Sequence, residues 1–189
     1  KIKFKLTSEL AELASMTMEI LSMDYWNVFY KNKNDIKRAK KELLQRVLYL
    51  LPMLAAVDKF QHWIYTNKHT AKEREEKWLK IESEFGNQII NYDNQEDILA
   101  NHWKNINHIF ESPFYVIEYA IAQLGAISIW KSYKELGEKA LENYINALKL
   151  GYTKSIPEIY ETAGIKFDFS ASYVKELAEF IKDELEKSS

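Results

Sequence analysis

The chain has 189 residues, with 26 Lys and Arg against 28 Asp and Glu and a formal net charge of −2 at pH 7. This balance argues against nucleic-acid binding, which normally needs a basic excess or a basic face. A hydrophobic content of 47% excludes intrinsic disorder. Cysteine is absent, which excludes disulfide frameworks, thiol catalysis and cysteine-ligated metal sites, so any metal must use His, Asp or Glu.

The most apolar stretch of the chain, residues 115–130, contains Glu118 and Gln123. It is shorter than the about 20 apolar residues that a helix needs to cross a bilayer, so we predict a buried helix and no membrane association. Residues 1–4 alternate charged and apolar side chains and contain no signal-peptide core. We therefore expect a cytoplasmic protein.

Helical periodicity dominates the sequence, and only five Gly and three Pro interrupt it. This predicts an all-α fold of about eight helices in a single helical domain, residues 1–189. In the first part of the chain we expect helices over residues 8–30, 35–51, 53–65, 71–85 and 95–105. Pro52 is expected to kink or split the second of these, Thr70 to cap the helix that follows it and Gly86 to end that helix.

Beyond a break at residues 107–113, four further helices are predicted. They cover residues 114–133, the segment between Gly137 and Gly151, residues 156–163 and residues 173–186. Pro157 falls in the first turn of the third of these, where a missing backbone N–H is tolerated, and Gly164 follows its end. No repeat, low-complexity tract or linker divides the sequence.

Several catalytic motifs are missing from the sequence. The four histidines, His62, His69, His102 and His108, form neither a His-Glu-x-x-His nor a Glu-x-x-His pattern. A self-contained zincin site and a ferritin-like di-iron site are therefore not predicted. A glycine-rich phosphate loop and a Gly-x-Ser-x-Gly elbow are also lacking, which leaves nucleotide binding and serine hydrolysis without support.

The first predicted helix carries Glu9, Glu12 and Glu19. Because residues 12 and 19 are seven positions apart, their carboxylates lie on one helix face, two turns apart. One interpretation is a solvated acidic face, which helices commonly present to water. The other is a metal ligand accompanied by a carboxylate that orients a neighbouring histidine ligand. Spacing alone favours the first.

Two further segments combine imidazole with carboxylate or phenol groups. Asp58 and His62 are one helical turn apart and can form either a packing pair or a catalytic pair, of which the packing pair is favoured. His108, Tyr115 and Tyr119 lie at the mouth of the predicted buried helix. They can be core residues with satisfied hydroxyl groups, or hydrogen-bond donors for an oxyanion. His69 and His102 are expected on the surface.

Three runs of the sequence, taken together and in order, resemble one family. They are TSELAELASMTME (7–19), VDKFQHWIY (57–65) with its companion ER...KW (73–78), and HIFESPFYVIEYAIAQLGAISIW (108–130). The tail, 150–170, is similar too. The chain resembles the C-terminal part of the catalytic domain of the M3 zinc metallopeptidases, in the oligoendopeptidase F branch.

The resemblance implies a helical zinc peptidase that cuts short peptides. Glu12, in the element Glu-x-x-Ser-x-x-x-Glu that Ser15 completes, looks like the third ligand of one zinc ion, and Glu19 like a supporting second-shell carboxylate. His108, Tyr115 and Tyr119 correspond to the groups that bind the scissile carbonyl and stabilise the tetrahedral intermediate. Which tyrosine does so stays open.

The His-Glu-x-x-His helix of the family would lie upstream of Lys1, in a missing N-terminal portion of the same peptidase. One carboxylate cannot hold a catalytic zinc, which needs three protein ligands, so we expect this chain to be inactive alone. The alternative is a non-catalytic helical binding or scaffold module derived from the same fold.

Overall fold

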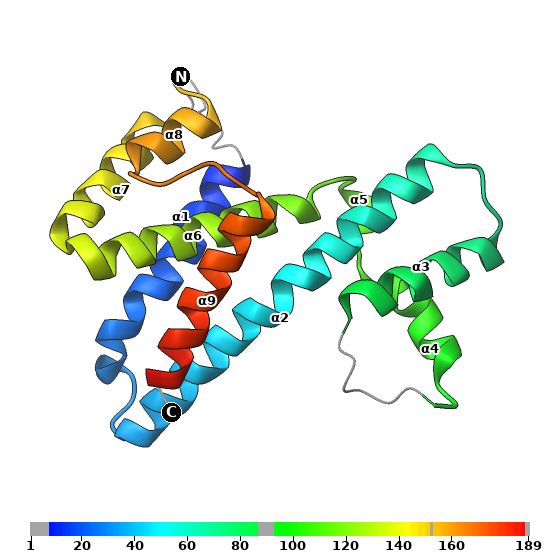
Figure 1. Ribbon diagram of the computed structural model, residues 1–189, viewed down its shortest axis with the longest axis horizontal. Helices are drawn as coiled ribbons and strands as arrows, with labels where there is room; N and C mark the ends of the chain where they lie inside the picture. Colours follow the sequence, from blue (N-terminus) through cyan, green and yellow to red (C-terminus); the bar gives the residue numbers. More distant parts are fainter. Residues whose placement is uncertain (1–7, 87–92, 152, 188–189) are drawn as a thin grey trace. The chain divides into compact units, whose positions relative to one another are not determined.

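The computed structural model describes residues 8–86, 93–151 and 153–187, and within these ranges its regular elements are all helical (Figure 1). The predicted all-α class is thereby confirmed. The elements are α1 (Ser8–Leu21), the 3-10 helix η1 (Ser22–Val28), α2 (Lys33–Thr66), α3 (Ala71–Phe85), α4 (Glu96–Asn101), the 3-10 helix η2 (His102–Asn105), α5 (His108–Glu111), α6 (Val116–Leu136), α7 (Glu138–Leu150), α8 (Ile156–Thr162) and α9 (Ala171–Lys187).

The chain folds as two compact units. The first unit takes in the chain up to Leu48 and again from Ile121 onward, and the second unit is Tyr49–Ala120. Helices α2 and α6 each contribute residues to both units. The single-domain organisation expected from the sequence stays a prediction, because two units joined by two continuous helices are compatible with one domain or two.

Several helix ends lie where the local sequence predicts them. Thr70 caps α3 through a capping box in which its side chain accepts from the backbone N–H of Glu73 while Glu73 accepts from the backbone N–H of Thr70. Gly137 and Gly151 bound α7 with positive φ angles of 58° and 53°, a conformation that glycine adopts without steric cost. These signals act within a single turn, which is why sequence reveals them.

The structure differs from the predicted helices and breaks at several places. The helix predicted to reach about Tyr30 becomes 3-10 from Ser22. Of the kink or split expected at Pro52, the split does not occur, because α2 continues through Pro52 to Thr66. Buried leucine, valine and phenylalanine side chains lie on both sides of the proline, and their packing outweighs its cost of about 3 kcal/mol. The predicted break at 107–113 contains the short helix α5.

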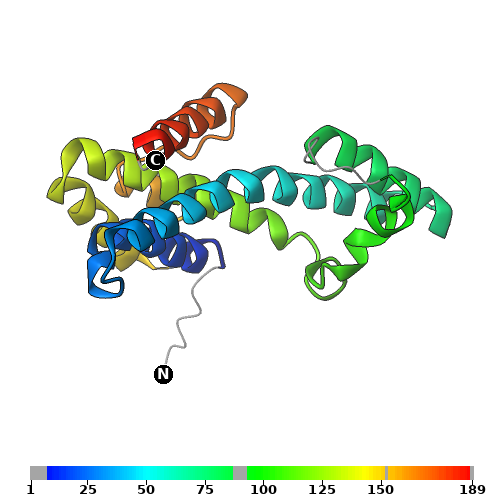
Figure 2. The same cartoon turned by 90° about the horizontal axis from the view of Figure 1, so that it is seen from below.

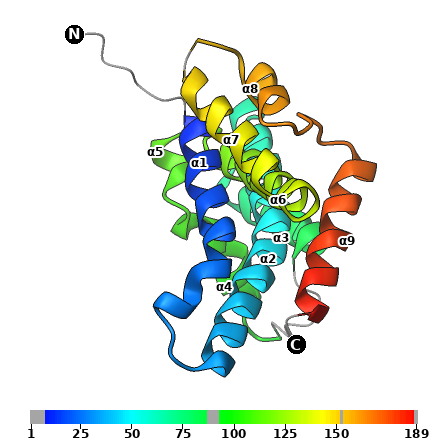
Figure 3. The ribbon, with the colours of Figure 1, turned by 90° about the vertical axis from the view of Figure 1, so that its left-hand side faces the viewer.

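The first unit places α1 through hydrogen bonds and one close approach. Tyr144 Oη on α7 donates to the carbonyl oxygen of Ala14 on α1 at 3.1 Å, and Figure 3 shows these two helices side by side. A Cβ atom on Gly125 of α6 would lie 2.7 Å from Leu13 Cδ1 and 2.7 Å from Tyr160 Oη. An alanine at this position would require the buried side chains of Leu13 and Tyr160 to shift.

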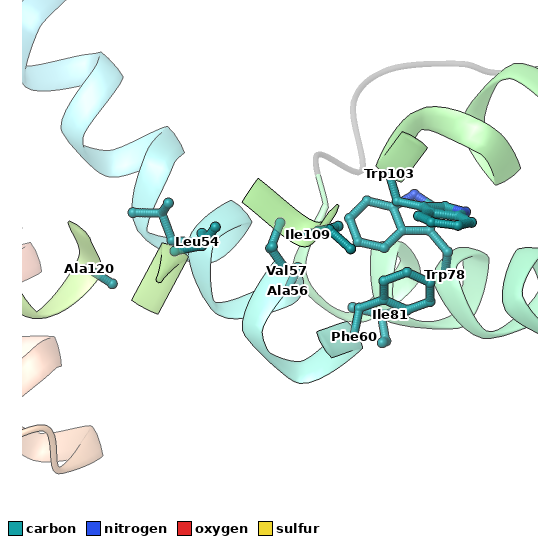
Figure 4. Packing of buried hydrophobic residues seen from close by; sticks show 10 residues of the cluster. Leu54, Ala56, Val57, Phe60, Trp78, Ile81, Trp103, Ile109 and Ala120 are labelled. Carbon is teal, nitrogen blue, oxygen red and sulfur yellow. The ribbon is translucent and has the colours of Figure 1, made fainter. Parts of the chain in front are cut away.

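The second unit is built around aromatic side chains. Phe60 of α2 lies 5.2 Å, between ring centroids, from both Trp78 of α3 and Trp103 of η2. Figure 4 shows these rings gathered at one end of the cluster, with Ile109 of α5 beside them. Burial of these rings stabilises the unit, since each removes a large apolar area from water. It also fixes α5 against α2.

None of the helices in the described part of the chain has both the length and the apolar character needed to cross a membrane.

Candidate functional site

Helix α1 presents a carboxylate held by a neighbouring hydroxyl group. Leu10, Leu13 and Ile20 are buried, while Glu12 on another side of the helix is half-buried. Ser15 Oγ lies 3.0 Å from the carbonyl oxygen of Glu12 and 3.5 Å from its Oε2. The single hydroxyl proton of Ser15 is therefore donated to the backbone, and the carboxylate that the sequence predicts to be a metal ligand lies at the limit of hydrogen-bond distance from it.

The second predicted carboxylate of α1 takes part in an ion pair. Glu19 Oε1 pairs with Arg46 Nη2 of α2, and Figure 2 shows α1 and the first half of α2 side by side. The neighbouring ion pair between Lys40 and Asp24 joins the same stretch of α2 to η1 at 3.7 Å. Arg46 is a partner that the sequence analysis missed, because residues 27 positions apart leave no local signal.

The structure brings His108, Tyr115 and Tyr119 together into one cluster, which we call the His/Tyr cluster. The rings of His108 and Tyr115 are parallel within 4°, with centroids 5.7 Å apart. The Tyr119 ring stands at 89° to His108 and at 88° to Tyr115, at 5.7 and 5.1 Å. Tyr119 Oη lies 3.4 Å from His108 Nε2, within hydrogen-bond reach. The grouping expected from the sequence is therefore present.

Local backbone geometry explains how this cluster forms. His108 begins α5, Tyr115 precedes α6 and Tyr119 lies in the first turn of α6. The backbone N–H of Tyr115 donates to the carbonyl oxygen of Ser112 at 3.1 Å, and its own carbonyl accepts from Glu118 N–H at 3.0 Å. All three rings are half-buried, so their polar atoms can be supported by the protein and still meet a ligand. Hydroxyl and imidazole N–H groups of this kind can stabilise a developing oxyanion.

Asp58 and His62 form the pair that their spacing predicts. Asp58 Oδ2 lies 3.6 Å from His62 Nε2, while Asp58 Oδ1 is buried with no hydrogen-bond partner among the described residues. Burial raises the pKa of Asp58, and the nearby His62 opposes this rise. Since the imidazole is mostly exposed, at 65%, the pair fits the packing interpretation at least as well as a catalytic one.

His69 differs from the surface position expected for it. It is half-buried, its ring stacks on Trp63 at 5.1 Å, and its Nε2 lies 2.9 Å from the carbonyl oxygen of Ile64. Arg74 Nη1 lies 3.0 Å from His69 Nδ1. Because a guanidinium can only donate, Nδ1 accepts and the proton resides on Nε2. His69 therefore joins α2 to α3, whereas His102 is exposed as predicted.

The described residues do not by themselves form a complete metal site. Across residues 8–86, 93–151 and 153–187, no three His, Asp or Glu side chains group closely enough to hold a metal ion. A catalytic zinc requires three protein ligands. The half-buried carboxylate of Glu12 is an oxygen donor of a kind that zinc accepts.

Most of the sequence also matches a known family. The model of peptidase family M3 matches residues 3–179. The chain belongs to peptidase family M3. Among the relatives of this M3 chain, an oligoendopeptidase F homologue from Borreliella burgdorferi is 51% identical over 45 residues, which are 24% of this chain and 8% of that protein. The resemblance to the oligoendopeptidase F branch is confirmed.

Solved structures agree with the M3 fold. PZ peptidase A, in a structure with inhibitor 2, is 27% identical with a TM-score of 0.85 over 96% of this chain and 33% of that one. A structure assigned to an oligoendopeptidase F of Bacillus anthracis is 28% identical with a TM-score of 0.76, over 96% of this chain and 29% of that one. The M3 chain described here thus spans about a third of the length of these solved relatives.

Proposed function

We propose that this M3 chain is the C-terminal part of the catalytic domain of a zinc-dependent oligoendopeptidase that hydrolyses short peptides. The His/Tyr cluster is the observation that carries the proposal. An imidazole and two phenols from two helices and the loop between them meet with their rings mutually oriented, as donors to a reacting carbonyl must be. The family membership of the chain and the half-buried carboxylate of Glu12 support it.

Glu12 would provide one ligand to the zinc ion. When bound, zinc supplies Lewis-acid polarisation of the scissile carbonyl and activation of water. Ser15 lies one turn away from Glu12 and donates to its backbone carbonyl oxygen, and Glu19 would be a supporting carboxylate kept in place by Arg46. The remaining ligands and the general base would come from a His-Glu-x-x-His helix in a portion of the peptidase outside this chain.

The His/Tyr cluster would act on the substrate side. As the peptide carbonyl becomes tetrahedral, its oxygen gains negative charge, and a Tyr hydroxyl or the His108 N–H can donate to it. Tyr119 and His108 are close enough to orient each other through Oη and Nε2. The parallel stack of Tyr115 on His108 restricts rotation of both rings.

The metal role is tested by Glu12→Gln in the intact peptidase, with Glu9→Gln on the same helix as the matched control. Removing the charged ligand should weaken zinc binding at least 10–100-fold, the range found for changes around metal ligands, and should abolish hydrolysis of a quenched fluorescent peptide. Glu9→Gln should retain both. Zinc content and turnover that survive Glu12→Gln would remove Glu12 from the ligand set.

The substrate-side role is tested by Tyr115→Phe and Tyr119→Phe, made separately. Loss of one oxyanion donor should lower kcat by about 10²–10³ with little change in KM, and the larger effect identifies the donor. The 189-residue chain by itself should hydrolyse no peptide, with or without zinc. An intact protein that binds zinc but does not hydrolyse peptides would instead favour the non-catalytic module.

A further inference from the structure

Phe114 has a backbone conformation that phenylalanine rarely adopts. Its φ is 61°, in the left-handed region where the Cβ atom of a bulky side chain is crowded by the backbone. The residue lies between Pro113 and Tyr115, at the point where the chain enters α6. Such an outlier persists only where surrounding contacts hold it, and outliers of this kind concentrate at functional sites.

Two rings of α2 hold Phe114 in place. The Phe114 ring centroid lies 4.8 Å from that of His62, at 51°, and 5.4 Å from that of Tyr65, at 68°. Residues 62 and 65 are three apart on one helix and therefore share a face. Phe114 itself is 38% exposed, so these two ring contacts, and not burial in a core, are what restrain it.

Tyr65 makes a second contact with the same segment. Its hydroxyl group donates to the carbonyl oxygen of Ile109 in α5. Ile109 follows His108 in the chain, and Phe114 precedes Tyr115. One side chain of α2 therefore restrains both the residue beside His108 and the residue beside Tyr115.

We propose that Phe114 and Tyr65 are positioning residues that set the ring geometry of the His/Tyr cluster. The left-handed φ at residue 114 sets the direction of the backbone from residue 114 to Tyr115. The Tyr65 contacts fix that direction relative to His108, so the two rings meet in parallel. The effect on catalysis rests on the proposed peptidase function, whereas the effect on ring geometry does not.

The geometric part can be measured on the 189-residue chain by NMR. A ring stacked on an imidazole shifts its carbon-bound protons upfield, so the Hδ2 and Hε1 signals of His108 report the stack with Tyr115. Phe114→Leu removes the ring but keeps the strained backbone. Phe114→Gly removes the ring and relieves the strain. We expect both variants to lose the upfield shift and Phe114→Tyr to keep it.

Phe110→Leu is the matched control. Phe110 belongs to the same segment, is 59% exposed and stacks on Trp103 instead of α2. This variant should leave the His108 signals unchanged. An upfield shift that persists in Phe114→Gly and in Tyr65→Phe, with the indole N–H signals of Trp78 and Trp103 showing an intact core, would overturn the proposal.

The catalytic part is measured in the intact peptidase. We expect Phe114→Gly and Phe114→Leu to lower kcat about 100-fold, since small misplacements of reacting groups have effects of that size, while Phe114→Tyr restores it. The melting temperature of Phe114→Gly should be at least that of Phe114→Leu, because the glycine relieves the backbone strain. The kcat of Phe114→Gly should nevertheless be no higher than that of Phe114→Leu. Activity that follows the melting temperature across the series would overturn the positioning role. An unmodified peptidase without turnover would contradict the proposed function and leave the NMR result standing.

Discussion

In the first unit, hydroxyl groups join one helix to another. Tyr144 donates to the backbone of α1, Tyr160 Oη donates to the carbonyl oxygen of Ile121 at 3.1 Å, and Ser128 and Tyr173 share a buried hydrogen bond at 2.8 Å. In the second unit, edge-to-face and tilted contacts between aromatic rings join the helices, and the buried indole Nε1 atoms of Trp78 and Trp103 have no hydrogen-bond partner among the described residues.

This contrast shows how each unit orients its functional groups. Directional hydrogen bonds and a glycine contact set the register of α1, and with it the position of Glu12. In the second unit, aromatic contacts fix ring angles through their preference for offset and edge-to-face geometries. The His/Tyr cluster there has two further restraints in our proposal, which are the left-handed Phe114 and the hydroxyl group of Tyr65.

The largest effect should come from the aromatic core. Phe60→Ala removes a ring with no exposed surface and should lower the free energy of unfolding by about 3–5 kcal/mol, as Phe→Ala does in other cores. Urea denaturation followed by tryptophan fluorescence measures it, with the exposed Phe110→Ala as control. A loss below about 1 kcal/mol would show that ring packing does not hold this unit together.

The glycine contact of the first unit is tested by Gly125→Ala. The new methyl group would lie 2.7 Å from both Leu13 Cδ1 and Tyr160 Oη, and overpacking of this kind costs about 1–3 kcal/mol. The denaturant midpoint of Gly125→Ala is compared with that of Leu136→Ala, at the exposed end of the same helix. The Leu136 variant should change the free energy of unfolding by at most about 0.5 kcal/mol. Equal stability of the two variants would contradict the close approach.

Tyr160→Phe separates the hydrogen bond from the close contact. Loss of the bond to Ile121 should lower the free energy of unfolding by about 1 kcal/mol. Because the same oxygen crowds an alanine at residue 125, the double variant Gly125→Ala/Tyr160→Phe should lose less stability than the sum of the single changes. Strict additivity in this double-mutant cycle would mean that the two residues act independently.

The smallest effect concerns the pH dependence of the second unit. Burial raises the pKa of Asp58 above its unperturbed value of 3.8. At a pH above the raised pKa, the ionised carboxylate lowers the free energy of unfolding. At a pH below 3.8 the carboxyl group is protonated in both the folded and the unfolded chain, so this loss of stability disappears. Asp58→Asn cannot ionise. The stability that Asp58→Asn gains over the unmodified chain should therefore be larger at pH 7 than at pH 3.5, measured by urea denaturation at both values. A stability difference between Asp58→Asn and the unmodified chain that is the same at both pH values would contradict this prediction.

Local signals in the sequence determined the all-helical class and many helix ends. The capping box of Thr70 and the positive φ of Gly137 and Gly151 depend on residues within one turn. The residue types of the run from His108 to Tyr119 made it a candidate, but by themselves they left a core role and an oxyanion role open.

Only the tertiary structure decided the rest, because contacts between distant residues outweigh local preferences. Packing on both sides of Pro52 keeps α2 continuous where a proline predicts a break. Arg46 reaches Glu19, and Tyr65 reaches Ile109, across intervals of 27 and 44 residues. The left-handed φ of Phe114 opposes the preference of its own residue type and exists because rings from α2 hold it there.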